Sequence, residues 1–457
     1  MFGEAVGRIR FGLLLLYPAS LPGISSALDS FPIMPTTTFD RHGLESGAVL
    51  KDVPVQYQTW GTLNDAGTNV LVVCHALTGD TDVATWWSDL IGPGRPLDTD
   101  CYFVICANAI GSPYGTVSPL TENVEAGAPY RSDFPQATIR DTVRLHHRLL
   151  WSLGVRRVAA AIGGSMGGMH VLEWALSGSF VQSIVPIAVG GRHSPWQIGW
   201  GEAQRQAIFA DPNWKGGNYT DDACPSRGLS VARMMAMVSY RSRPSFESRF
   251  GRERQTDGHT GSQTGGQTDG SANASPYQVE TYLRYHGKKL DERFDANCYV
   301  HLTRQMDTHD VSRDRGAYPD VLASIQQPAF IIGIESDVLY PVEEQRELAE
   351  HLPNATLAVI DSPHGHDGFL IEQDDLAELL VPWLQQHASP ARAGMSANPA
   401  TRTKGTTGLR SNGEAGHAGA DHHEITPHPA SPSASDGTAE TPPPKVSAGD
   451  VAKSNDM

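Results

Sequence analysis

The stretch Ala161–His170, AIGGSMGGMH, decides the fold, and it raises the question of whether Ser165 is a nucleophile or only a small residue in a glycine-rich turn. An apolar run at 158–164 leads into the serine and a helical pattern at 169–177 follows it, so Ser165 is predicted to lie where a strand ends and a helix begins. Residues 163–167 fit the pattern G-x-S-x-G, whose glycines remove side chains that would collide with the neighbouring strand and helix. The serine hydroxyl is therefore expected at the N-terminus of a helix, where developing negative charge is stabilised.

Short β-rich runs alternate with helical patterns on both sides of this turn, from about Asp40 to Ala388. The runs are continuously apolar, which suits strands of a parallel sheet that is buried on both faces. They lie at 70–77, 102–108, 158–164, 184–189, 328–334 and 355–360. This alternation predicts an α/β fold with a mostly parallel sheet and helices on both faces.

A long gap separates the fourth of these runs from the fifth, and it exceeds the length of an ordinary crossover connection. It contains three helical patterns, at 194–211, 228–250 and 277–294. We therefore predict a helical cap inserted into the α/β core. The predicted boundaries are 191–320 for the cap and 40–190 with 321–388 for the core.

Three segments have compositions that do not predict a packed core. Residues 389–457 consist mainly of Pro, Gly, Ser, Thr and Ala, which predicts a disordered tail. Residues 258–275 are of low complexity and are expected to form a surface loop. Residues 1–39 are interpreted as a poorly ordered leader. Because its start is poor in acids and contains arginine and serine, a mitochondrial protein is kept as the alternative to a cytoplasmic one.

Composition also limits the partners of the chain. A formal net charge of −16 argues against a nucleic-acid surface. The apolar run Phe11–Tyr17 is far shorter than the ~20 residues that cross a bilayer, so no membrane partner is expected. Five cysteines without a CxxC pair suit a reducing compartment, and Cys74 and Cys106 are expected to be buried. No cluster shows metal-ligand spacing, so neither a metal nor a bound cofactor is expected.

A nucleophilic serine requires a histidine base that is oriented by an acid. When the serine follows a strand in this way, the acid and the histidine follow later strands, in the chain order serine, acid, histidine. The last two predicted strands lead into Asp337 and into His366, which are the expected acid and base. Glu335 is kept as an alternative acid, and His364 is a second imidazole that could be mistaken for the base.

Two backbone amides are expected to form an oxyanion hole. One belongs to Met166, the residue after the serine, and the other lies in the loop after the first predicted strand, at Leu77 or Ala76. The side chain of His75, in the same loop, is expected to pack or to cap rather than to catalyse.

The chain resembles the homoserine O-acetyltransferases, a branch of the α/β-hydrolase fold that acylates a small amino-acid hydroxyl before sulfur is incorporated into methionine. The likeness extends from about Tyr57 to Glu372 and looks closest to fungal members. It rests on the blocks CHALTGD (74–80), NAIGSPYG (108–115), IGGSMGGM (162–169), ARMMAMVSYRS (232–242), MDTHDVSR (306–313) and SPHGHDGFL (362–370). His170 stands where the family usually has an amide side chain. The resemblance implies an α/β-hydrolase fold whose mostly parallel sheet carries an inserted helical cap.

The same resemblance implies roles for individual residues. Arg233, Tyr240 and Asp367 are expected to face the amino-acid substrate. A zwitterionic acceptor needs a guanidinium for its carboxylate and a carboxylate for its ammonium group, which agrees with Arg233 and Asp367. The nucleophile, the orienting acid and the base are expected to be Ser165, Asp337 and His366.

The implied reaction is a two-step acyl transfer. Acetyl-CoA, a substrate rather than a bound cofactor, acylates Ser165; L-homoserine, deprotonated by His366, then attacks the acyl-enzyme. A serine acceptor, a succinyl donor and a serine esterase remain alternatives, because only the exclusion of water and the acceptor site separate a transferase from a hydrolase. The resemblance also leaves a homodimer open.

Overall fold

A computed structural model describes residues 34–255 and 275–388. The predicted tail, nearly all of the predicted low-complexity loop and most of the predicted leader lie outside the described residues. The leader interpretation is wrong at its end, since strand β1 (Thr36–Gly43) begins before residue 39. This strand has no continuous apolar run because it lies at the edge of the sheet and pairs only with β2 (Val49–Trp60).

Among the described residues, eight strands form one sheet in the order β1-β2-β6-β3-β9-β10-β11-β12. From β6 onward the neighbouring strands in this order are parallel, whereas β2 is antiparallel to both of its neighbours. The parallel strands are β3 (Val70–Cys74), β6 (Phe103–Ala107), β9 (Val158–Gly164), β10 (Ile184–Ile187), β11 (Ala329–Ile334) and β12 (Ala355–Ile360). Each coincides with a run predicted from the sequence, so the mostly parallel α/β sheet is confirmed.

The core lies on both faces of this sheet, and strand β3 shows why its sequence is continuously apolar. Val70, Val72 and Cys74 point into the layer that contains α2 (Ile139–Ser152) and α3 (Met166–Ala175). Alternate β3 side chains point into the opposite layer, which contains α1 (Val83–Trp86) and α12 (Gln373–His387). Because successive strand residues face opposite sides, a strand covered on both faces needs an apolar residue at every position.

Short polar motifs set where the main helices begin. Thr138 and Asp141 form a reciprocal capping box, in which each side chain accepts the other's backbone amide, and this starts α2. In the cap, Ser194 and Gln197 form the equivalent box at the start of α4 (Pro195–Phe209). These motifs satisfy amide groups that the helix itself leaves without partners.

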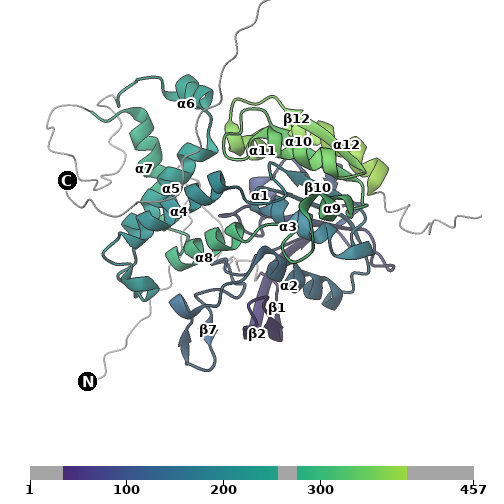
Figure 1. The fold of residues 1–457 in the computed structure, drawn as a ribbon, viewed down its shortest axis with the longest axis horizontal. Coiled ribbons are helices and arrows are strands. Elements are labelled where there is room, and N and C mark those ends of the chain that lie inside the picture. Colours follow the sequence, from purple (N-terminus) through teal and green to yellow (C-terminus); the bar gives the residue numbers. More distant parts are fainter. Residues whose placement is uncertain (1–33, 256–274, 389–457) are drawn as a thin grey trace, which may run out of the picture. The chain divides into compact units, whose positions relative to one another are not determined.

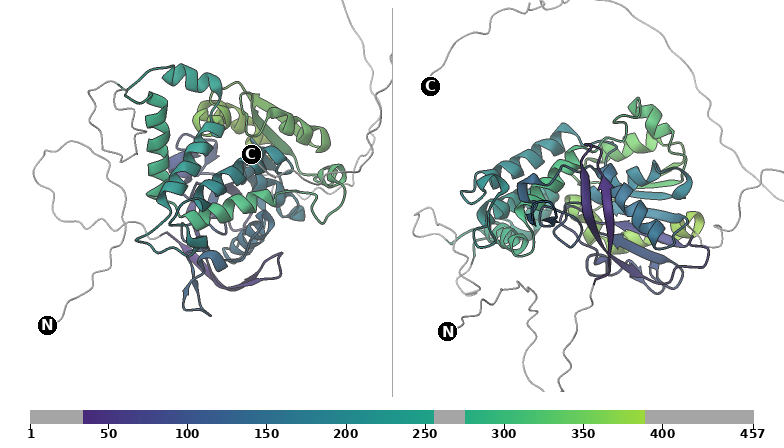
Figure 2. Two further views of the ribbon diagram at one scale, coloured as in Figure 1. Left: turned by 60° about the vertical axis from the view of Figure 1, so that its left-hand side comes forward. Right: turned by 90° about the horizontal axis from the view of Figure 1, so that it is seen from below.

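Among the described residues, six α-helices lie between β10 and β11, in the gap where a cap was predicted. Figure 1 shows α4 to α7 gathered together beside the sheet, and the views of Figure 2 show them apart from the paired purple strands β1 and β2. After α4 come α5 (Ser226–Tyr240), α6 (Arg243–Phe250), α7 (Gln278–Asp291), α8 (Ala296–Asp307) and α9 (Tyr318–Ala323). The single helix predicted at 228–250 is two helices, because Ser242 caps α6 and Pro244 lies in its first turn.

Shorter elements complete the fold. No helix in the described ranges is long and apolar enough to cross a membrane. The remaining helices and 3-10 turns are α10 (Val342–His351), α11 (Gly368–Ile371), η1 (Arg131–Asp133), η2 (Gly178–Phe180), η3 (Lys215–Gly217) and η4 (Gly365–Asp367). Two small two-stranded sheets are formed by β4 (Ile91–Gly92) with β5 (Leu97–Asp98) and by β7 (Glu122–Asn123) with β8 (Ala128–Pro129).

Candidate active site

Ser165 occupies the sharp turn between β9 and α3, as the sequence predicts. Its backbone has φ 59° and ψ −124°, a region that is strained for a residue with a side chain. Two hydrogen bonds hold this conformation: its amide donates to the Ile187 carbonyl (3.0 Å), and its carbonyl accepts the Met169 amide (3.1 Å). The strained residue therefore presents its side chain at the N-terminus of α3.

The glycines around the serine allow α3 to pack tightly against the sheet. A Cβ atom at Gly167 would lie 2.1 Å from the carbonyl oxygen of Cys74, and one at Gly163 would lie 2.7 Å from the same atom. A Cβ atom at Gly168 would lie 2.7 Å from a methyl carbon of Val189. All three distances are too short for real contacts, so the pattern G-x-S-x-G is required here by packing.

The acid and the base meet at the ends of two neighbouring strands, β11 and β12. Asp337 Oδ2 lies 2.6 Å from His366 Nδ1, and both side chains are buried. Asp337 Oδ1 accepts the backbone amides of Leu339 and Tyr340, at 2.8 and 2.9 Å. The carboxylate therefore has fixed partners on both oxygens, and it sets the histidine tautomer in which Nδ1 carries the proton. Nε2 of His366 is left as a buried acceptor without a partner among the described residues.

The alternative acid, Glu335, and the second imidazole, His364, both have partners outside the Asp337–His366 pair. The Glu335 side chain is 56% exposed, and its carboxylate lies 4.0 Å from Arg346. His364 contacts Arg241 and Ser245 through Nδ1, at 3.4 and 3.2 Å. Neither residue therefore takes part in the acid–base contact that Asp337 makes.

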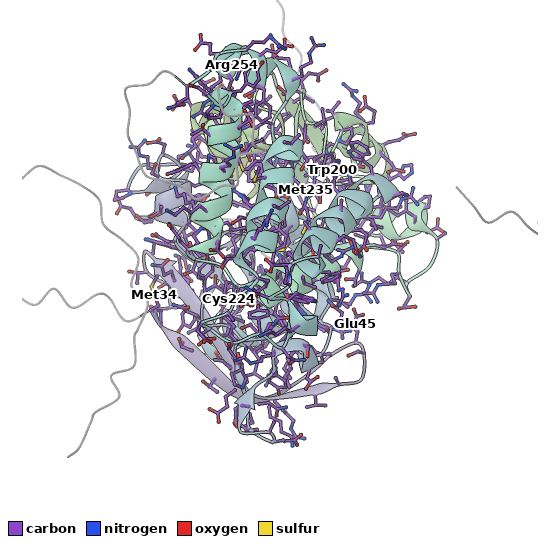
Figure 3. The ribbon with its side chains drawn as sticks, turned by 90° about the vertical axis from the view of Figure 1, so that its left-hand side faces the viewer. Met34, Glu45, Trp200, Cys224, Met235 and Arg254 are labelled. Carbon is purple, nitrogen blue, oxygen red and sulfur yellow. The ribbon has the colours of Figure 1, made fainter. Side chains whose placement is uncertain are left out.

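A small cavity of about 30 Å³ lies beside the serine. Ser165 lines it together with Tyr240 and Tyr340, whose rings lie 5.8 and 5.0 Å from the ring of His366. The cap contributes much of the remaining wall. Figure 3 shows Trp200 of α4 near Met235 of the adjacent helix α5. The further lining residues are Leu77, His193, Gln197, Trp200, Gly201, Gln204, Thr303, Met306 and Leu339.

Met166 and Leu77, the residues expected to supply the oxyanion amides, are both close to the serine, one in the chain and the other in the cavity wall. Met166 is the first residue of α3, so its amide has no carbonyl partner within the helix. Leu77, rather than the alternative Ala76, is among the residues that line the cavity. Both ring nitrogens of His75 are engaged: Nδ1 contacts the Ala76 carbonyl (2.8 Å) and Nε2 accepts the Ala109 amide (3.1 Å). His75 therefore holds the loop after β3 in place.

Arg233 and Tyr240 lie on the same side of α5, facing the core. The Arg233 guanidinium carbon is 5.5 Å from the centre of the Tyr240 ring, and Nη1 is 3.5 Å from the hydroxyl of Thr78. The arginine is thus held between the cavity wall and the loop after β3. This places a positive charge close to, but outside, the residues that directly line the small cavity.

Asp367, which was expected to face the substrate, forms an ion pair with an arginine of the cap. Its Oδ2 lies 3.0 Å from Nε of Arg241, and both side chains are largely buried. Burial raises the pKa of Asp367, whereas the charges of Arg241, Arg233 and His366 oppose that rise. Sequence reasoning missed Arg241, because nothing in a single sequence shows that the residue after α5 reaches the loop after β12.

Several residues around the cavity beside Ser165 were also missed from the sequence. His193 Nε2 lies 3.1 Å from the Tyr340 hydroxyl, and the Tyr340 ring stacks on His366. The only sequence signal for Tyr340 is its position three residues after Asp337. Gln197 and Thr303 come from separate cap helices, and no local motif connects them with the serine.

Buried histidines and cysteines lie around the site. His170, the departure from the family pattern, is buried in α3 near His146, and burial holds its pKa well below the ordinary value. Cys74 and Cys106 are buried, and burial raises the pKa of the Cys74 thiol to about 12. Within the described part of the chain, no group of three or more His, Cys, Asp or Glu residues could hold a metal ion.

Comparison with known proteins assigns the family. The model of the α/β hydrolase fold matches residues 69–373. A homoserine O-acetyltransferase from Salinibacter ruber is 60% identical over 353 residues, which cover 76% of this chain and 96% of that protein. The chain belongs to the homoserine O-acetyltransferase family.

A fungal relative and a solved esterase structure are also similar to this chain. A fungal homoserine O-acetyltransferase from Gibberella moniliformis is 45% identical over 396 residues, 81% of this chain and 85% of that protein. The likeness therefore extends to fungal members but is not strongest there, since the bacterial relative is more similar than this fungal one. The crystal structure of esterase E22 has a TM-score of 0.69 and 25% identity, covering 77% of this chain and 99% of the esterase.

Proposed function

We propose that this protein transfers an acetyl group from acetyl-CoA to the side-chain hydroxyl of L-homoserine through an acyl-enzyme at Ser165. The acyl-transfer step is supported by one observation: the Asp337–His366 pair leaves Nε2 of the histidine without a partner among the described residues, and the His366 ring contacts Tyr240 and Tyr340, which line the same cavity as Ser165. The choice of acceptor and donor rests on the 60% identity with the Salinibacter ruber homoserine O-acetyltransferase.

In the first half-reaction, Nε2 of His366 removes the proton of the Ser165 hydroxyl as Oγ attacks the thioester carbonyl carbon. The amides of Met166 and Leu77 stabilise the negative oxygen of the tetrahedral intermediate. When this intermediate collapses, the carbon–sulfur bond breaks and the histidine returns the proton to the sulfur of CoA. Asp337 stabilises the imidazolium that exists between these events.

In the second half-reaction, the same histidine takes the proton of the homoserine hydroxyl, whose oxygen attacks the acetyl-enzyme. The bond to Ser165 Oγ breaks, and the serine regains a proton from His366. In this proposal Arg233 binds the acceptor carboxylate. Asp367 faces the acceptor ammonium while Arg241 holds it in position.

A serine esterase is the second candidate, because esterase E22 shares the fold and 25% of its sequence with this chain. The two reactions differ only in whether water or an amino acid reaches the acyl-enzyme. The guanidinium of Arg233 beside Tyr240 favours transfer, because it offers a partner for the carboxylate of an amino-acid acceptor. Serine as acceptor or succinyl as donor would use the same catalytic residues.

A panel of CoA-release assays tests these alternatives together. Acetyl-CoA or succinyl-CoA is supplied with homoserine, with serine or with neither, and hydrolysis of p-nitrophenyl acetate is measured in parallel. The proposal expects the highest kcat/KM with acetyl-CoA and homoserine, and slow release without an acceptor. Ester hydrolysis that is fast and unaffected by homoserine would contradict it and favour the esterase.

A further inference from the structure

A second cavity, of about 360 Å³, lies on the opposite side of helix α8 from the Ser165 cavity. One side of α8 lines the second cavity. Residues three or four positions apart lie on the same side of a helix, and the lining residues of α8 are Asn297, Val300, His301 and Arg304. Thr303 and Met306, on the opposite side of α8, line the cavity beside the serine. The two cavities share no lining residue, and the larger one has the volume of a typical small-molecule site.

Two arginines give this cavity a positive charge. Arg131 reaches it from η1 and Arg304 from α8, so they enter from different elements. Arg131 is half-buried and Arg304 is exposed, and in the described ranges neither forms an ion pair with a carboxylate. Two unpaired guanidiniums that line one cavity favour an anion, and their planar donors suit the several oxygens of a phosphate.

Aromatic and amide side chains form the rest of the wall. Phe209 and Trp214 pack together with their ring centres 5.2 Å apart, and the Arg304 guanidinium lies 5.8 Å from the centre of the Phe209 ring. Phe134 contributes a third ring. The amides of Gln136 and Asn297 also line the cavity, so a flat ring with polar edges has both stacking and hydrogen-bonding partners.

His301 is a buried polar group that the protein does not satisfy. The side chain is 5% exposed, and its Nε2 has no hydrogen-bond partner among the described residues. Burial lowers its pKa to about 3, so the ring is neutral and has one donor and one acceptor nitrogen. The Nε2 atom is itself buried, close to Gly111, so the neutral ring contributes a flat wall beside Phe134, whose ring centre is 4.9 Å away.

The backbone at the cavity rim is also strained. Arg131 has φ 50°, and Lys215, next to the lining residue Gly216, has φ 45°. The Arg131 amide donates a hydrogen bond to the Pro119 carbonyl (2.7 Å), which fixes the arginine on the rim. Strained residues with side chains persist where the surrounding structure holds them, often at ligand sites.

We propose that this second cavity binds a phosphate that carries a heteroaromatic ring, with Arg131 and Arg304 on the phosphate and the ring against Phe209 and Trp214. A free nucleotide and the nucleotide end of CoA share this chemistry. Both sources would use the same two arginines, and kinetics separate them.

Isothermal titration of the full chain with AMP tests the site, with adenosine and inorganic phosphate as partial probes. AMP should bind more tightly than adenosine or phosphate, because only AMP supplies both the ring and the charge. Arg304→Ala and Arg131→Ala should each weaken AMP binding about tenfold or more. Arg284→Ala, which removes an exposed arginine of α7, should leave AMP binding unchanged.

Arg304→Lys is a conservative control for misfolding. It keeps the positive charge and the aliphatic part of the side chain but loses the planar donors, so it should bind AMP with intermediate affinity. Wild-type melting temperature in the variants shows that they are folded. Failure of wild-type protein to bind AMP at millimolar concentration would overturn the proposal. Unchanged AMP affinity in a folded Arg131→Ala/Arg304→Ala double variant would do so equally.

Steady-state kinetics identify the source of the nucleotide. If the cavity takes the nucleotide end of CoA, AMP should compete with acetyl-CoA, and Arg304→Ala should raise KM for acetyl-CoA but not for homoserine. If it takes a free nucleotide, AMP should not compete with acetyl-CoA, and KM for acetyl-CoA should be unchanged. Either result supports the site, since both require AMP binding that depends on the two arginines.

Discussion

At the scale of single residues, the position of Asp337 explains why one carboxylate and not its neighbour can orient the base. One oxygen accepts two backbone amides and the other contacts His366, so the side chain cannot rotate without losing three partners. Glu335 is two residues away in the chain, but its side chain points to solvent. Sequence spacing alone left the two carboxylates as alternatives.

Replacing Asp337 with asparagine should lower kcat for homoserine acetylation by about 10³- to 10⁴-fold, because the amide no longer favours the productive tautomer and does not stabilise the imidazolium. Glu335→Gln, the matched control, should change kcat by less than about twofold. Steady-state CoA release measures both variants. A larger loss in Glu335→Gln would show that the acid has been assigned wrongly.

Arg233→Ala should separate the two half-reactions. An acceptor-site arginine acts only after the acyl-enzyme exists, so rapid mixing with acetyl-CoA should still give a full burst of CoA. In contrast, kcat/KM for homoserine should fall by about 30- to 1000-fold, as expected for loss of a charge-assisted pair worth ~2–4 kcal/mol. Loss of the burst with homoserine use otherwise intact would place Arg233 in the CoA site instead.

At the scale of secondary-structure elements, the contact between α3 and β3 controls the position of the nucleophile. The two elements approach so closely that glycine is the only residue that fits at position 167. This could be predicted in part, because continuous apolar runs and a glycine-rich turn are visible in a sequence. The edge strand β1, its neighbour β2, the break between α5 and α6 and the helix α8 were not predicted, since partly exposed or cap elements depend on tertiary contacts.

Gly167→Ala should lower the free energy of unfolding by about 3 kcal/mol or more and abolish activity, because the new Cβ would meet a backbone carbonyl that cannot move aside. Gly199→Ala is the matched control. Gly199 lies in the exposed interior of α4 with no atom within 4 Å of an added Cβ, so the change should raise the free energy of unfolding by about 0.5–1 kcal/mol. Urea unfolding of both variants checks the contrast, and equal effects would contradict it.

At the scale of the whole molecule, the site is assembled from the core and the cap together. The turn that carries Ser165 and the contact between Asp337 and His366 could be predicted, because these residues follow strands in a fixed chain order. The cavity wall could not, since Gln197 and Thr303 come from cap helices that only the folded chain brings together. One buried link between the two parts is Glu344 of α10, which accepts a hydrogen bond from Gln197 of α4 (2.8 Å).

The buried carboxyl group of Glu344 leads to a prediction about how stability depends on pH. Burial raises the pKa of Glu344 from its ordinary value of 4.5 to about 7, so between these values the folded protein keeps a proton that the unfolded chain has lost. The free energy of unfolding should therefore fall as pH rises through this window. Glu344→Gln removes this effect. The free energy of unfolding of the variant, relative to that of wild type, should therefore rise on the order of 1–3 kcal/mol from pH 5 to pH 8.

Urea unfolding of both proteins at the two pH values measures this difference. Glu343→Gln, a change at an exposed neighbouring carboxylate, is the control and should show a much smaller change with pH. A difference between Glu344→Gln and wild type that does not depend on pH would contradict the assignment of a bound proton to this buried carboxylate.

Mass spectrometry of the intact protein, followed by peptide mapping, tests the central claim most directly. The protein is mixed with acetyl-CoA in the absence of an acceptor and quenched with acid, then compared with a sample to which homoserine is added before quenching. The account predicts one acetyl group per chain on Ser165, which disappears as O-acetylhomoserine forms, and no acetylation in Ser165→Ala. An active wild-type enzyme that carries no acetyl group on Ser165 at any time, or a Ser165→Ala variant that still forms O-acetylhomoserine, would contradict it.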